Sequence, residues 1–319
     1  MTTIPAPTNA APAAEPDGLL PHRVESGRER RSERLLVWLF LIPTVGGLAL
    51  FTLVPIVASF VLAFFQWDII ESPEWVGLQN FGDIVSDATV RVAFRNTIGF
   101  VIVAVALQLA IALWLAILVQ SRLPTWLQGA FRSAFFFPLV LSAASVSLVM
   151  SYLFNADFGL VNSILNFVGI ADVQWLSTSS GALTVVIVVY VWQNFGFSFL
   201  LFLGGLSTIP KEVYEASELD GAKGWSRFAK ITMPLISPTM LVATVIALIA
   251  ALQIFDQPWV LTRGGPGDAT RTAVMMIYQS GFQELQFGRA SAIGIVLTLV
   301  ILGVTALQFR LSRRYVFYQ

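Results

Sequence analysis

Residues Ser207–Pro234 read STIPKEVYEASELDGAKGWSRFAKITMP and lie between two long apolar runs of the chain. This stretch contains all three lysines of the protein, together with Arg227 and four carboxylates. The runs on either side carry no charged residue except Asp256, near the far end of the second run. Because charged side chains are costly inside a bilayer, this pattern predicts a water-exposed loop that connects two membrane-spanning segments.

The loop has the local signals of a helix, a turn and a second helix. Ser207 or Thr208 is a candidate N-cap, and Pro210 suits a first helical turn. Asp220 and Gly221 then end the first helix, because glycine accepts the left-handed conformation that is common at helix C-termini.

Each predicted helix carries a narrow apolar stripe that recurs every third residue. The stripe residues are Val213, Ala216 and Leu219 in the first helix, and Trp225, Phe228 and Ile231 in the second. We expect the two stripes to pack against each other, so that the loop forms a compact unit.

A longer motif in the same stretch resembles that of a known family. Glu215, Ala216 and Ser217 are followed after three residues by Gly221 and, after nine more, by Ile231–Pro234. This spacing resembles the EAA loop of bacterial ABC importer permeases, whose pattern has Ala and Leu where this chain has Ser217 and Met233. In that family the loop is a coupling helix that docks into the ATPase subunit. The resemblance implies an ATPase-coupling role for Glu215, Ala216, Ser217, Asp220, Gly221, Ile231 and Pro234.

The composition agrees with a polytopic membrane protein. Of 319 residues, 56% are hydrophobic and only 12% are charged, which is too apolar for a soluble domain of this size. The chain has no cysteine, so it has no disulfide, thiolate nucleophile or thiolate metal site. Its single histidine, His22, lies in a Pro- and Ala-rich leader, so we expect its side chain to be solvated.

Six stretches are long and apolar enough to cross a bilayer as helices, which takes about 20 residues each. They are residues 35–60, 94–119, 135–154, 183–206, 235–261 and 290–309. The fold class predicted is therefore all-α and polytopic. The family resemblance covers about residues 35–316 and implies the type I ABC importer permease fold, with the coupling loop at residues 207–234.

The distribution of Lys and Arg predicts the orientation. With both termini in the cytoplasm, fourteen Lys and Arg residues fall on the cytoplasmic side and five fall outside. Residues 1–34 have low hydrophobicity and end in a basic cluster, so we expect a disordered cytoplasmic tail. The apolar run that follows is too long for the core of a signal peptide.

Three classes of function compete. The chain lacks the Gly-x4-Gly-Lys-Ser/Thr motif that cradles nucleotide phosphates, so an ABC transport subunit would need a separate ATPase. An ion-gradient-driven secondary transporter of a small polar solute is the alternative, although Asp256 is the only carboxylate within a predicted span and lies near its outer end. A membrane enzyme would need clustered catalytic groups, and the sequence offers no such cluster.

An aromatic- and amide-rich run at residues 192–197 lies in the fourth predicted span. Aromatic walls with a few amides suit sugars, whereas an aromatic belt at the membrane interface is the alternative interpretation. The chain is similar to maltose-type permeases, and this similarity implies substrate contacts at Trp192, Gln193, Asn194 and Phe197, at Ser142 and Ala143, and, with a gap in the register, at Gln253 and Asp256.

The same resemblance implies the partners. It predicts a heterodimer with a second, related permease, an ABC ATPase dimer on the cytoplasmic side and an extracytoplasmic solute-binding protein, all at the bacterial inner membrane. It implies neither a cofactor nor a metal, and no nucleic acid partner. The residues do not distinguish one sugar from another, or a sugar from a polyol phosphate.

Overall fold

The computed structural model describes residues 27–68 and 70–313, and these divide into two units between Ile56 and Val57. Most of the expected disordered tail, residues 1–26, lies outside the described residues. Residues 27–34, which belong to that expected tail, are instead the start of helix α1, Gly27–Leu48.

The first unit is a run of helix. Helix α1 continues through a π-helical segment, η1 (Ala49–Leu53), into α2 (Val54–Leu62), and the division between the two units falls within α2. Its large apolar side chains are exposed, for example Phe40 at 74% and Phe51 at 79%. The segment Trp38–Leu62 is long and apolar enough to span a membrane, and none of its side chains is buried within the chain itself. Such a surface requires an apolar covering.

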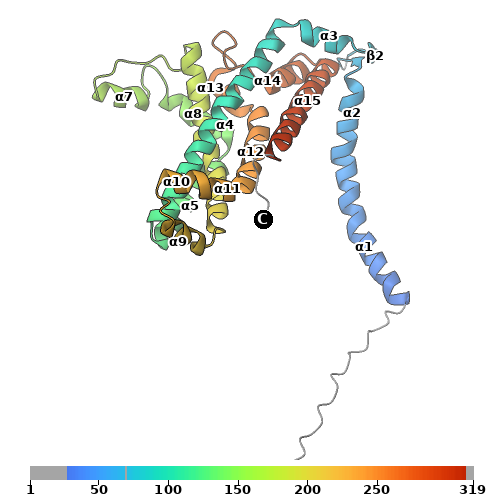
Figure 1. Cartoon of the computed structure of the whole chain (residues 1–319). Coiled ribbons are helices and arrows are strands. Elements are labelled where there is room, and N and C mark those ends of the chain that lie inside the picture. The colour runs from blue at the N-terminus through green and yellow to red at the C-terminus, as the bar shows by residue number, and fades with distance from the viewer. Residues whose placement is uncertain (1–26, 69, 314–319) are drawn as a thin grey trace, which may run out of the picture. The chain divides into compact units, whose positions relative to one another are not determined.

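The second unit contains the remaining elements (Figure 1). In chain order they are β1 (Phe65–Gln66), β2 (Glu74–Trp75), α3 (Gln79–Ser86), α4 (Ala88–Arg122), α5 (Thr125–Val140), α6 (Ala143–Leu153), α7 (Leu160–Phe167), α8 (Ser179–Ser207), α9 (Lys211–Leu219), α10 (Trp225–Arg227), η2 (Phe228–Thr232), α11 (Met233–Leu235), α12 (Ser237–Leu252), α13 (Asp256–Thr262), α14 (Ala273–Tyr278), η3 (Gln279–Gln283) and α15 (Phe287–Ser312). The two short strands pair antiparallel, with Phe65 opposite Trp75.

Helices α4 and α8 form the centre of this unit and pack along much of their length (Figure 1). Alanines at positions 104, 112 and 116 of α4 are fully buried, and their small side chains let the two backbones approach. The amide of Gln108 donates to the Ser198 hydroxyl at 2.9 Å, so a polar bond also ties α4 to α8 inside the apolar interface.

Four of the six predicted spans are single helical runs, at Trp38–Leu62, Ala88–Gln120, Ser179–Ser207 and Phe287–Ser312. The third predicted span, 135–154, is bent by 96° between α5 and α6, and α12 is bent by 71° against the helix that precedes it. If each bent pair is one span, the described residues provide up to six. The expected all-α polytopic class is confirmed, whereas the side on which the termini lie stays a prediction.

The fifth predicted span, residues 235–261, is also not continuous. Helix α12 ends at Leu252, and α13 begins at Asp256. Pro258 explains the break, because proline has no N–H to donate to the carbonyl of Ile254 four residues earlier. The hydroxyl of Thr272 donates to that carbonyl instead, at 3.1 Å.

The contact between α5 and α8 depends on a glycine. A Cβ added at Gly196 would overlap the backbone carbonyl of Phe135, which cannot move without shifting α5. Gly204, in the same helix, has no neighbouring atom near its missing Cβ.

We expect Gly196→Ala to lower the melting temperature of the purified protein, because overpacking of this kind costs about 1–3 kcal/mol. Gly204→Ala is the matched control and should leave it unchanged or raise it slightly, since alanine favours helix. Thermal unfolding of both variants in the same detergent measures the difference. A Gly196→Ala protein as stable as Gly204→Ala would contradict the close approach of the two helices.

Candidate functional site

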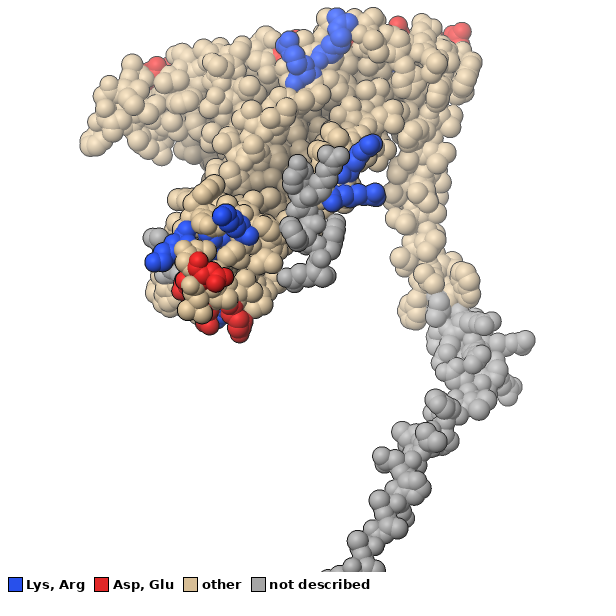
Figure 2. Space-filling view, in the orientation of Figure 1, with Lys and Arg blue, Asp and Glu red and all other residues tan. Residues whose placement is uncertain are grey.

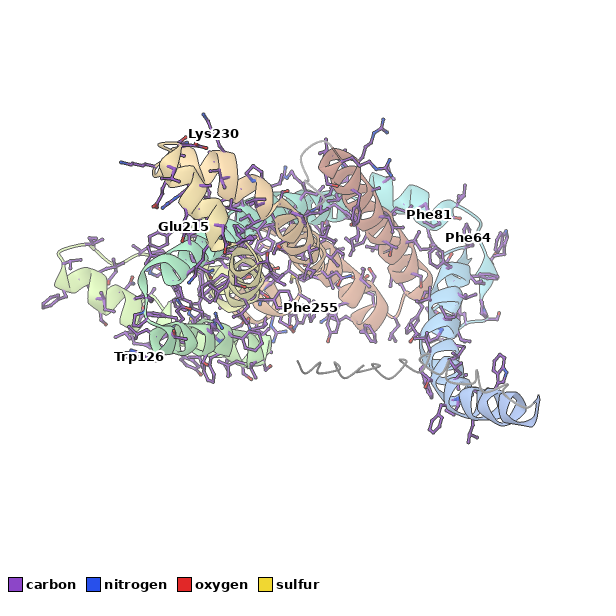
Figure 3. All side chains as sticks on the ribbon, turned by 60° about the horizontal axis from the view of Figure 1, so that its bottom comes forward. Phe64, Phe81, Trp126, Glu215, Lys230 and Phe255 are labelled. Atoms are coloured by element: carbon purple, nitrogen blue, oxygen red, sulfur yellow. The ribbon has the colours of Figure 1, made fainter. Side chains whose placement is uncertain are left out.

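A cavity of about 270 Å³ lies where two helix breaks face α8. One is the bend between α5 and α6, and the other is the interruption between α12 and α13. The lining residues are Leu139, Leu141, Ala143, Tyr190, Gln193, Asn194, Ala250, Gln253, Ile254, Phe255, Asp256 and Gln257. Figure 3 shows Phe255, one of them, among the helices of the bundle. The polar lining groups are a phenol, amides and one carboxylate.

Gln193 joins the two breaks to α8. Its side-chain amide donates to the carbonyl of Leu141 at 3.1 Å, at the α5–α6 bend. Its side-chain oxygen accepts from the amide of Gln257, in α13, at 3.0 Å. Gln193 and Gln257 are 4% and 5% exposed, so these bonds are shielded from water. Gln193 therefore holds the cavity together, which is a positioning role in addition to the solute contact expected from the sequence.

Tyr190 and Asn194 face the cavity one helical turn apart on α8. The Tyr190 side chain is 3% exposed, and its hydroxyl has no hydrogen-bond partner among the described residues. Its ring meets Phe100 edge to face at 5.1 Å between centroids. Asn194 uses its amide nitrogen to bond the Tyr190 carbonyl at 2.9 Å. A buried hydroxyl without a partner is costly, so this phenol is a strained polar group in the cavity wall.

Gln253 and Asp256 lie at the exposed side of the same cavity. The sequence interpretation placed Asp256 near the outer end of one long helix, but the structure makes it the first residue of α13. Its carboxylate therefore lies beside a helix break at the exposed side of the cavity, and it is in none of the ion pairs among the described residues.

The cavity gathers five of the eight predicted substrate residues: Ala143, Gln193, Asn194, Gln253 and Asp256. Ser142, Trp192 and Phe197 are not among its lining residues. Trp192 follows Tyr190 by two positions, which is about 200° around a helix, so it faces away and is 38% exposed. Tyr190 and Gln257 were not predicted from the sequence. A search for polar residues three and four positions apart would have found Tyr190 beside Gln193 and Asn194.

The charged loop 207–234 forms a separate part of the surface, where basic and acidic side chains gather around α9 and α10 (Figure 2). The predicted turn is confirmed: α9 ends at Leu219, and Gly221 adopts the left-handed conformation at φ 77°. The amide of Ala222 then donates to the carbonyl of Ser217 at 2.9 Å, which closes the helix end.

The two predicted apolar stripes do not pack against each other. Leu219 and Trp225 are 90% and 76% exposed. Polar contacts join the two helices instead: Arg227 pairs with Glu218 at 2.5 Å and lies over the ring of Tyr214 at 5.8 Å. The expectation failed because a stripe of three residues is too short to exclude water, whereas Val213 and Tyr214 pack onto the end of α8.

The predicted helix caps also differ from the structure. The hydroxyls of Ser207 and Thr208 donate back to the carbonyls of Gly204 and Gly205, at 2.6 and 2.8 Å. They therefore complete the end of α8 rather than the start of α9, where Pro210 holds the cap position without a side-chain bond.

The predicted coupling residues divide between the surface and the interior. Glu215, Ala216, Asp220 and Gly221 are exposed, and Glu215 and Lys230 lie on the projecting part of the unit, away from Phe255 (Figure 3). Ser217 is 5% exposed and donates to the Tyr214 carbonyl at 2.7 Å, so it stabilises the loop. Ile231 in η2 and Pro234 in α11 are half-buried.

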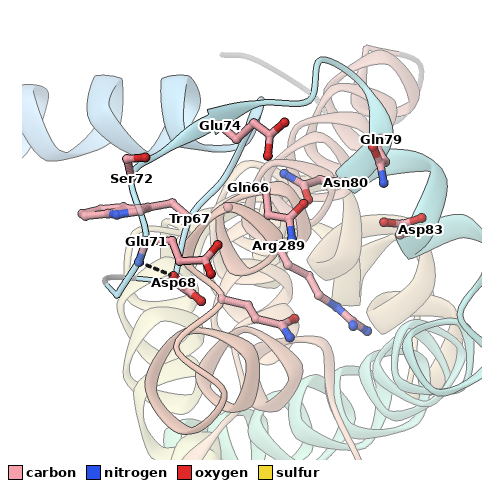
Figure 4. Close-up of a pocket in the computed structure, with 12 residues that line it drawn as sticks. Gln66, Trp67, Asp68, Glu71, Ser72, Glu74, Gln79, Asn80, Asp83 and Arg289 are labelled. Atoms are coloured by element: carbon pink, nitrogen blue, oxygen red, sulfur yellow. Dashed lines mark hydrogen bonds between the residues drawn. The ribbon is translucent and has the colours of Figure 1, made fainter.

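A second pocket, of about 370 Å³, lies near the strand pair. Asp68 and Glu71 approach it from one side, and Gln79 and Asp83 of α3 from the other (Figure 4). Asn80 supports its floor with two bonds to the carbonyls of Ala63 and Phe65, both at 2.9 Å. In the part of the chain that the structure describes, no group of three or more His, Cys, Asp or Glu residues is placed to hold a metal ion.

Arg289, from the same pocket, forms an ion pair with Asp87 at the start of α4. Burial alone would raise the pKa of the Asp87 carboxyl. The amides of Val90 and Thr89, together with Arg289, outweigh burial and lower the pKa below its usual value. Because the folded-state pKa is depressed, this group stabilises the fold above its unfolded pKa, and that stability is lost as the pH falls through the folded value.

We expect Asp87→Ala to destabilise the protein by about 1 kcal/mol at neutral pH, because it removes a helix N-cap as well as the ion pair. The melting temperature of the unmodified protein should fall as the pH drops below about 4. The difference in melting temperature between this protein and Asp87→Ala should become smaller in that pH range. Ser86→Ala is the control. A constant difference between pH 7 and pH 3 would contradict the lowered pKa.

A bundle of apolar helices that encloses a polar cavity and carries a charged loop at one end is the architecture of a membrane transport subunit. The fold matches a bacterial ABC transporter involved in the import of the acidic polysaccharide alginate, with a TM-score of 0.80 and 23% identity over 90% of this chain and 98% of that chain. The profile of the family described as "Binding-protein-dependent transport system inner membrane component" matches residues 108–316. The chain belongs to this family.

Curated relatives match the sequence over most of the chain. It is 32% identical to the sulfoquinovosyl glycerol transport system permease protein SmoG of Agrobacterium fabrum, over 88% of this chain and 91% of that protein. It is 31% identical to the trehalose/maltose transport system permease protein MalF of Thermococcus litoralis, over 88% and 95%. The protein is thus the permease subunit of an ABC importer and a multi-pass inner-membrane protein, as the motif in residues 215–234 predicted.

Proposed function

We propose that this permease forms, together with a second related permease, the translocation pathway for a sugar or a sugar-like solute. An ABC ATPase dimer would supply the energy, and an extracytoplasmic solute-binding protein would deliver the solute. The names of the relatives support a carbohydrate: one is a permease for sulfoquinovosyl glycerol and another for trehalose and maltose. A solved alginate transporter with a similar fold is in complex with an alginate pentasaccharide-bound periplasmic protein, which supports such a delivery partner.

The observation that carries this proposal is the chemistry of the cavity between the helix breaks. Asn194 and Gln253 present two amides, the Tyr190 phenol lies in the wall behind them, and Phe255 adds an aromatic ring. Solutes with many hydroxyls need several neutral donors and acceptors together with an apolar face. Asp256 is the single charged group at the cavity, and a carboxylate there also accepts sugar hydroxyls.

Coupling to an ATPase would act through the tip of loop 207–234. Exposed Leu219 and Trp225 offer apolar contacts among charged neighbours, which suits insertion into a protein cleft. The salt bridge between Glu218 and Arg227, with Arg227 over the ring of Tyr214, ties α9 to α10, so the loop would move as a body. Helix α12 runs from this loop to the cavity break at Gln253 and would transmit the motion.

The ion-gradient alternative has one supporting observation, the exposed carboxylate of Asp256 beside the cavity. The two mechanisms differ in a simple measurement on vesicles that contain the complete transporter. Uptake by an ABC importer continues with ATP in the presence of a protonophore and stops with vanadate. The opposite result would reject the ATP-driven proposal.

The cavity proposal predicts that Tyr190→Phe and Asn194→Ala slow solute uptake by about tenfold each, which corresponds to one lost hydrogen bond of about 1.4 kcal/mol. Initial uptake rates in vesicles measure this effect. Co-purification of the ATPase should be unchanged, because neither residue lies near loop 207–234. Tyr152→Phe, at an exposed tyrosine outside the cavity, and Val188→Ala, on another face of α8, are the matched controls. Normal uptake by both cavity variants would show that the solute pathway does not pass through this cavity.

The coupling proposal predicts that Trp225→Ala and Leu219→Asp weaken association with the ATPase by at least about tenfold, since a buried interface aromatic contributes about 2 kcal/mol or more. Quantitative pull-down of the ATPase subunit from the detergent-solubilised complex measures this association. Trp114→Ala, at a tryptophan of α4 that is 63% exposed, is the control and should leave it intact. If Trp225→Ala retains full ATPase binding, the docking surface is not at this tip.

A further inference from the structure

The segment between α6 and α8 carries a short helix, α7, whose apolar side faces outward. Leu160, Ile164 and Phe167 are 56%, 57% and 91% exposed, and Phe158 just before the helix is 65% exposed. Positions 160, 164 and 167 follow the spacing of one helix face. A soluble loop would turn such a face inward, so this arrangement requires an apolar covering.

The inner side of α7 is held by a polar residue. Asn162 is 3% exposed. Its amide donates to the carbonyls of Ala156 and Val173 at 3.0 and 3.1 Å, and its side-chain oxygen accepts from the indole of Trp175 at 2.8 Å. These bonds orient the helix, so the outward direction of Ile164 and Phe167 is a fixed feature of the segment.

The outward face of α7 continues the apolar surface of α6. On α6, Leu148, Val149 and Tyr152 are 53%, 57% and 60% exposed, and α6 belongs to one of the candidate membrane spans. The ring of Tyr152 contacts that of Phe158 at 6.4 Å between centroids, which joins the two surfaces.

Charge and position agree with a lipid environment. Helix α7 itself carries no charged residue: residues 155–182 contain no Lys or Arg, and their two carboxylates, Asp157 and Asp172, lie outside the helix. Figure 2 shows no basic group on the part of the unit that carries α7, and α7 projects sideways from the bundle of α4 and α8 in both Figure 1 and Figure 3. A helix that leaves the end of a transmembrane bundle sideways runs along the membrane plane.

We infer that α7 lies in the membrane–water boundary, with Leu160, Ile164 and Phe167 among the lipid acyl chains and Asn162 turned toward the protein. An interfacial helix places its apolar face about 5–10 Å below the headgroups. It would hold the segment between α6 and α8, and with it the outer end of the cavity walls, at a constant depth. This inference depends on the membrane location of the chain and not on the identity of the solute.

The absence of cysteine makes a direct test possible. Phe167→Cys and Ile164→Cys place a single thiol on the outward face, and Asn166→Cys places one on the flank of the same helix, where Asn166 bonds Asp172. Each variant is labelled with an environment-sensitive fluorophore and assembled with cysteine-free partner subunits in phosphatidylcholine nanodiscs. A second set of nanodiscs contains spin-labelled phosphatidylcholine as a quencher.

The expected result is a blue-shifted emission at positions 164 and 167, with most of the intensity lost in the quencher nanodiscs. The probe at position 166 should emit as in water and lose little intensity. Water-like emission at all three positions would overturn the inference. So would blue-shifted emission that lipid quenchers leave intact, since it would assign the face to the second permease or to the solute-binding protein. Two outward positions keep the result independent of any single substitution.

Discussion

The structure depends on how broken helices satisfy their backbone groups inside a membrane. No water is present in the hydrocarbon core, so each carbonyl freed by a helix break needs a donor from the protein. Gln193 supplies one to Leu141, and Thr272 supplies one to Ile254. Gln257 then connects Gln193 to α13. The cavity exists because these side chains replace the missing helical bonds, which leaves space and polar groups at the same place.

Local signals in the sequence were reliable where a single residue decides the backbone. Gly221 ends α9 in the left-handed conformation that the sequence predicted, and the long apolar runs around positions 100, 195 and 300 became helices. Their observed ends lie a few residues beyond the predicted ones, because helices continue past the apolar part of a span into water.

Features that depend on three-dimensional neighbours were not predictable. Proline at 138 or 258 indicates that a helix is disturbed, but not whether it kinks or stops, and only the positions of Gln193 and Thr272 make a full break stable. The run at residues 192–197 is dense along the sequence, yet successive residues of a helix lie about 100° apart. It therefore points in several directions, and Tyr190 shares the cavity face with Asn194 while Trp192 does not. Ser207 and Thr208 fit either helix end by residue type, and the carbonyls of α8 were nearer.

Helix α12 has a mechanical consequence. One of its ends adjoins the charged loop and the other adjoins the gap that borders the cavity, and its sixteen residues form an unbroken hydrogen-bonded rod. An α-helix is stiff along its axis, so a push at one end of α12 reaches the other with little loss, and the chain changes direction by 71° at the corner before it. A displacement of loop 207–234 at one end of α12 would therefore shift the cavity wall at the other end. A displacement of that wall by a bound solute would likewise shift the loop.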